Sequence, residues 1–82
     1  MGEAITLDHL VKKLEGLHDA MRKGELEHGE YDQRLARMIT ELRERKLVAE
    51  RPEILSTLQD LEQRGIVTAS VRSHIVSRLG LA

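Results

Sequence analysis

The segment RKGELEHGEY, residues 22–31, contains two of the six glycines of the chain and its only aromatic residue. Its glutamates and His28 admit two interpretations, either a site for metal or acid–base chemistry or a turn between two helices. The basic residues at its start suit the negative end of a helix dipole, and Gly24 permits the left-handed backbone that ends many helices. The glutamates then suit the positive end of a following helix. The segment is therefore predicted to be the turn of a helical hairpin.

Apolar residues on both sides of this segment recur with the three- and four-residue steps of an α-helix. These stripes run from Leu7 to Met21, from Tyr31 to Leu42, from Ile54 to Leu61 and from Val71 to Leu79. Thr6 and Thr68 are suitable N-caps for the first and last helices, and Pro52 suits a helix start. We therefore predict an all-α fold, a small bundle of four helices at about 7–23, 29–48, 52–64 and 69–79.

The two halves of the chain correspond to one another. A shift of 41 residues places Gly24 on Gly65 and Leu26 on Val67, and it aligns the preceding leucines as well. Each half therefore reads as a helix, a glycine, an apolar residue that closes the end of the hairpin, and a second helix. We expect one domain over residues 1–82, with hairpins at about 6–49 and 51–82.

The stretch LEGLHDAMRKGELEHGEYDQRLARMI, residues 14–39, resembles the short C-terminal domain (SHOCT) family. The glycine, apolar residue, acid and aromatic of that family's pattern correspond to Gly24, Leu26, Glu30 and Tyr31. The chain departs from the pattern at Glu27, where a threonine-like cap is expected, and at Gly29, which replaces an acid. The resemblance implies a helical hairpin that serves in oligomerisation or docking and carries no catalytic group.

Composition narrows the function classes. Hydrophobic residues make up 40% of the chain and charged residues 33%, which is typical of a soluble globular domain. Since no apolar run approaches the roughly 20 residues of a membrane span, we expect no membrane association and a cytoplasmic location. The core must be aliphatic because Phe and Trp are absent. Small aliphatic cores are often completed by a partner chain, so we expect a homo-oligomer, with a dimer favoured.

The sequence offers little catalytic chemistry. The absence of cysteine excludes thiol nucleophiles and disulfides. The histidines, which are His9, His18, His28 and His74, lack the spacing of metal ligands, and no glycine-rich nucleotide-binding motif is present. We therefore predict no catalytic residue, no metal site and no cofactor, and a protein that is not an enzyme.

The favoured functional hypothesis is binding to another protein through aliphatic helix faces, as an adaptor, assembly factor, regulator or inhibitor. Leu47 and Val48 fall off the stripe of the second helix, and the last helix carries apolar residues on more than one side. Apolar groups outside a small core are typical of partner surfaces. The expected partner-binding residues are Leu47, Val48, Val76 and Leu81.

The alternative is a small DNA-binding transcriptional regulator that uses the helix at about 69–79. The pieces VRSHI and RLGL, within residues 71–81, resemble the recognition helix of LuxR-type regulators. Such a helix presents small polar and basic side chains to the major groove. The residues that the alternative assigns to nucleic acid are Arg72, Ser73, His74, Ser77 and Arg78.

Overall fold

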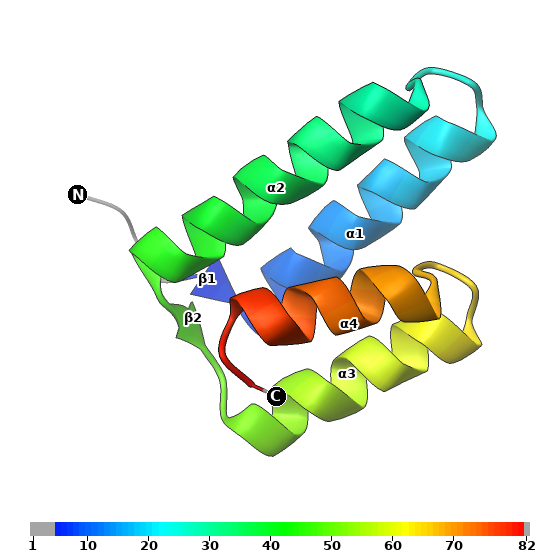
Figure 1. Cartoon of the computed structure of the whole chain (residues 1–82). Coiled ribbons are helices and arrows are strands. Elements are labelled where there is room, and N and C mark those ends of the chain that lie inside the picture. The colour runs from blue at the N-terminus through cyan, green and yellow to red at the C-terminus, as the bar shows by residue number, and fades with distance from the viewer. Residues whose placement is uncertain (1–4, 82) are drawn as a thin grey trace.

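The computed structural model describes residues 5–81, apart from the side chain of His28, and within them it contains four helices and two very short strands (Figure 1). In chain order these are β1 (Ile5–Thr6), α1 (Leu7–Arg22), α2 (His28–Arg45), β2 (Leu47–Val48), α3 (Arg51–Gln63) and α4 (Ala69–Arg78). The predicted four-helix, predominantly all-α fold is confirmed.

The helices begin where the sequence places suitable caps. The Thr6 hydroxyl accepts a hydrogen bond from the His9 N–H at 3.2 Å, and the Thr68 hydroxyl accepts one from the Val71 N–H at 3.1 Å. Each bond satisfies one of the N–H groups that a helix start leaves without a partner inside the helix. Both threonine caps are therefore confirmed.

The segment between α1 and α2 is a turn, as predicted, and it has a counterpart between α3 and α4. Gly24 and Gly65 adopt φ angles of 74° and 78°, in the left-handed region that glycine enters without steric cost. The next N–H in each turn donates to the carbonyl five residues earlier at 2.9 Å, which is the Schellman arrangement. Leu26 and Val67 follow these glycines and are buried, so each closes the end of its hairpin.

The predicted end of the second helix, at residue 48, is wrong, because α2 ends at Arg45. Lys46 takes a positive φ of 65° that breaks the helix, and β2 then runs parallel to β1, with Ile5 opposite Leu47. At about 100° per residue, Leu47 would point away from the apolar stripe of α2 if the helix continued. As a strand residue it packs against the core instead.

The two hairpins pack as two layers of helices. The shortest dimension of the molecule is 20 Å, which is about two helix diameters. The inter-helix turns lie at one end and the paired strands at the other (Figure 1), while α1 contacts both α2 and α3. An ion pair of 2.8 Å between Glu15 of α1 and Arg64 at the end of α3 joins the two hairpins.

One cluster of aliphatic and methionine side chains forms the core. Its buried members are Ile5, Leu10, Leu14, Leu17, Leu26, Leu35, Met38, Ile39, Leu42, Ile54, Leu58, Leu61, Val67 and Ile75. No polar or charged side chain within the described residues is buried. Residues of the helices, of β1 and of the two turns together form this core within one chain.

Replacement of glycine should have opposite effects in the turn and in the helix. Gly16→Ala should raise the free energy of unfolding by about 0.5–1 kcal/mol, because Gly16 is helical and an added Cβ meets nothing within 4 Å. Gly24→Ala should lower it by about 1–2 kcal/mol, because its φ is positive. Urea denaturation measures both changes. Gly65→Ala is the control for the turn and should match Gly24→Ala; equal stability of all the variants would contradict the prediction.

Candidate functional site

A groove of about 690 Å³ lies between α1 and α2. It is lined by residues of α1, of α2 and of the turn that joins them, namely Lys12, Lys13, Gly16, Leu17, Ala20, Leu26, Glu30, Gln33, Arg34, Arg37, Met38 and Glu41. None of them belongs to α3 or α4. The groove is therefore a feature of the first hairpin alone.

The floor of the groove is apolar and narrow. Leu17, Leu26 and Met38 form its buried part, and the small residues Gly16 and Ala20 lie one turn apart on α1. A Cβ at Gly16 would meet nothing within 4 Å, so packing does not require glycine there. Glycine inside a helix destabilises it by roughly 0.5–1 kcal/mol relative to alanine. At this point the backbone of α1 is open to close approach from outside.

The two carboxylates that line the groove form an ion pair or a hydrogen bond within the chain. The Glu41 carboxylate pairs with Arg45, with 2.7 Å between Oε1 and Nη1. The Glu30 carboxylate accepts a hydrogen bond from the Glu27 N–H at 3.5 Å, as part of a capping box at the start of α2. Glu27 thus serves at the position where the SHOCT pattern has threonine. Both carboxylates are directed towards partners on α2 or its N-cap.

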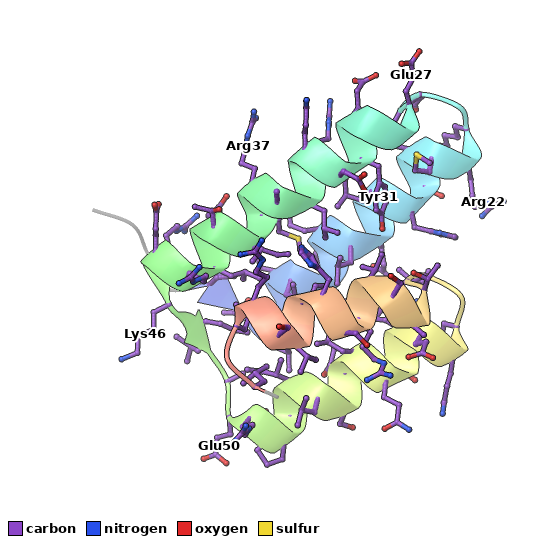
Figure 2. All side chains as sticks on the ribbon, in the orientation of Figure 1. Arg22, Glu27, Tyr31, Arg37, Lys46 and Glu50 are labelled. Atoms are coloured by element: carbon purple, nitrogen blue, oxygen red, sulfur yellow. The ribbon has the colours of Figure 1, made fainter. Side chains whose placement is uncertain are left out.

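The cations that line the groove outnumber its acids and are mostly unpaired. Lys12 pairs with Asp8 at 3.3 Å, one helical turn away on the exposed face of α1. Within the described part of the chain, Lys13, Arg34 and Arg37 take part in no ion pair, and all three are exposed. Arg37 projects from α2 away from the other helices (Figure 2). The groove therefore presents an apolar floor beside a positively charged rim.

A smaller concavity of about 400 Å³ lies where α1 meets the turn between α3 and α4. It is lined by Glu15, Gly16, His18, Asp19, Arg22, Arg64 and Ile66. Its charges largely pair with one another or with neighbours: Arg64 lies 2.8 Å from Glu15 and 3.8 Å from Asp60, and Asp19 lies 3.7 Å from Lys23. This arrangement links the two hairpins.

The expected partner-binding residues gather around the connection between β2 and α3. A third glycine turn, at Gly80, returns the chain so that the Leu81 N–H donates to the Val76 carbonyl at 2.9 Å. The Arg51 guanidinium donates to the Leu81 carbonyl at 2.6 and 3.2 Å. Leu47, Val76 and Leu81 are half-buried against the core, whereas Val48 is 60% exposed.

The residues assigned to nucleic acid divide into two groups. Ser73, His74, Ser77 and Arg78 are exposed on α4. Arg72 is half-buried and pairs with Glu62 of α3. One of the two α4 cations is therefore held against the protein surface.

The structure describes three of the four histidines in full, and the side chain of His28 lies outside the described part. Within that part, no group of three His, Asp or Glu side chains could hold a metal ion. No helix within residues 5–81 has the length and apolar character needed to cross a bilayer.

Tyr31, the aromatic residue of the opening segment, lies between α2 and α1 and is half-buried against the core (Figure 2). Burial raises the pKa of its phenol, and the neighbouring carboxylate of Asp32 raises this pKa further. Both effects disfavour the phenolate anion. The side chain therefore acts as a neutral packing element.

Sequence reasoning missed the groove. Gly16 was visible as a glycine inside a helical stripe, and such a glycine signals either a packing or a functional need. Arg34 and Arg37 resembled the solvated face of a helix, because their nearness to α1 depends on how the two helices pack. That packing has no local signature.

We compared the chain with models of protein families, with curated protein sequences and with solved structures, and none of these comparisons finds a match.

The raised pKa of Tyr31 predicts a loss of stability in alkaline solution. Unfolded tyrosine loses its proton near pH 10, whereas folded Tyr31 holds its proton more tightly. The stabilisation is thus fully present below about pH 10 and is lost as the pH rises through the folded-state pKa. Thermal melts at about pH 8 and about pH 11 should show a larger loss for the wild type than for Tyr31→Phe. Equal losses in the two proteins would contradict the prediction.

Proposed function

We propose that the protein is a non-enzymatic interaction module that binds another protein through the α1–α2 groove, as an adaptor, assembly factor or small regulator. The observation that carries the proposal is the combination of an apolar floor with three exposed cations that have no partner in the described part of the chain. A partner would pack against this floor, whose side chains are already largely buried, while the charges set its orientation.

Two features of the sequence support the same function. The resemblance of residues 14–39 to the SHOCT family implies a hairpin used for docking or oligomerisation. No catalytic motif accompanies that hairpin, which supports the non-enzymatic part of the proposal. A cytoplasmic location belongs to the same proposal.

DNA binding through α4 is the second candidate. The exposed row of Ser73, His74, Ser77 and Arg78 favours it. With Arg72 engaged by Glu62, however, Arg78 is the remaining cation of α4. Affinity for DNA depends mainly on neutralised phosphates, so one cation supplies little of it. We therefore place this candidate behind protein binding.

A side chain at Gly16 should block partner binding without harming the fold. Gly16→Gln places an uncharged residue that favours a helix at the groove, and the added Cβ meets nothing within 4 Å. Gly29→Gln is the matched control, because Gly29 is also helical and unobstructed but does not line the groove. Proteins captured from an extract of the source cells by the wild type and by Gly29→Gln should fall by about tenfold or more with Gly16→Gln.

The proposal fails if the three proteins capture the same set in equal amounts. Quantitative mass spectrometry of the captured proteins makes the comparison. Circular dichroism of each variant establishes that loss of capture does not reflect loss of helix.

Self-association is a further part of the proposal. Val48 is the one large hydrophobic residue that is exposed within the described chain, and it lies on β2, whose outer edge is joined by no third strand in residues 5–81. Edge strands and exposed apolar groups favour pairing with another chain. A second copy at this edge would form the dimer that the sequence leads us to expect.

Val48→Asp should shift a dimer to the 9.3 kDa monomer with little change in stability, because the side chain is already largely in water. Light scattering over a range of concentrations measures the mass. Leu7→Val, which changes a half-buried side chain of α1, is the control and should leave the mass unchanged. A wild-type protein that is strictly monomeric at every concentration would end this part of the proposal.

A further inference from the structure

We infer that the segment which occupies the groove is an acidic amphipathic α-helix of a different protein, with small or aliphatic residues on one face and Asp or Glu along its flanks. This inference rests on the proposed function and names the chemical class of the partner.

The positive charge along the groove favours a partner with acidic side chains. Four cations and two carboxylates line it, so their sum is +2. Both carboxylates already have partners on α2 or at its N-cap. Lys13 on the α1 side and Arg34 and Arg37 on the α2 side are exposed and take part in no ion pair with any described residue. A helix lying between them would meet a cation on each flank.

The walls of the groove favour a partner segment that is helical over one that is extended. Both walls are α-helices, whose backbone N–H and C=O groups are bonded within each helix. An extended peptide would find no strand edge there to satisfy its own backbone groups. A helix satisfies these groups internally. The α2 wall runs from Glu30 to Glu41, which is about 16 Å and matches about three helical turns.

Small residues on α1 permit close contact along the floor. Gly16 and Ala20 lie one turn apart, and the distance between packed helix axes depends on the side chains at the contact. A partner helix with alanine or leucine on its inner face could approach α1 closely at Gly16 and pack over the remaining exposed margin of Leu17 and Met38. The partner thus needs an apolar face as well as acidic flanks.

A second copy of this chain does not fit the groove. Val48 is the one large hydrophobic residue that is exposed within residues 5–81, and it lies on a strand. On the described helices every large hydrophobic side chain is at least partly buried, so these helices offer no fully exposed aliphatic side chain to the floor. A nucleic acid would use the cations and leave the apolar floor uncovered.

Selection from a displayed library of helical peptides tests the inference. Each peptide has about 18 residues, a fixed face of Ala and Leu, and flanks randomised among Glu, Lys and Gln. The wild-type protein should enrich Glu on the flanks by about tenfold over Lys. The double variant Arg34→Glu/Arg37→Glu should reverse this preference, and Gly16→Gln should abolish enrichment. Arg43→Glu/Arg78→Glu changes the net charge equally at exposed sites outside the groove and should retain the preference for Glu.

The possible results separate the two proposals. Enrichment of Lys or Gln by the wild type, or no enrichment, overturns the acidic-helix inference; where such binding still depends on Gly16, the proposed function stands. Enrichment that survives Gly16→Gln moves the contact away from the groove and counts against both. Duplex and single-stranded oligonucleotides form a separate arm. Tighter binding of an oligonucleotide than of the selected Glu helix, lost in Arg34→Glu/Arg37→Glu, overturns the inference in favour of nucleic acid.

Discussion

Burial of four aliphatic stripes in one cluster is the interaction on which the rest of the structure depends. Each fully buried leucine or isoleucine contributes about 1.5–3 kcal/mol relative to exposure, and this has to offset the entropy of ordering the chain. Aliphatic side chains are shorter than aromatic ones, so the helices must approach closely to leave no voids. The glycine turns at Gly24 and Gly65 make this possible, because each reverses the chain within a few residues and places a buried apolar residue beneath the turn.

This way of building the core determines which surface stays exposed between α1 and α2. The α2 stripe faces inwards, and α1 lies between α2 and α3, so the outer seam between α1 and α2 keeps only the margin of the core as its floor. Cations from both helices stand along that seam while the nearby carboxylates are held by Arg45 and by the N-cap of α2. The groove is thus a consequence of helix packing combined with an uneven pairing of surface charges.

The helices and the turns could be predicted from the sequence, because apolar stripes, helix caps and turn glycines are local signals. The two strands, at Ile5–Thr6 and Leu47–Val48, could not be predicted. They pair across more than forty positions of the chain, and with two residues each they are too short to show alternating apolar and polar residues. The groove could not be predicted from the sequence for a related reason. Lys13 and Arg34 line the same concavity only because α1 packs on α2. Leu47, Val76 and Leu81, which are predicted to bind a partner, are half-buried against the core, and this partial burial depends on tertiary packing.

The 41-residue correspondence between the two halves of the chain shows how the two hairpins differ. Their glycine turns share the same backbone and hydrogen bonds, yet the buried faces of α1 and α3 correspond only at Leu17 and Leu58. The shift of 41 residues places Lys13 on Ile54 and Ala20 on Leu61, and the α3 members of both pairs are buried in the core. Part of the face that α3 buries in the core therefore lies towards the groove in α1. Because α1 obtains its core contacts from Leu10, Leu14 and Leu17, Lys13 and Gly16 remain exposed beside the groove.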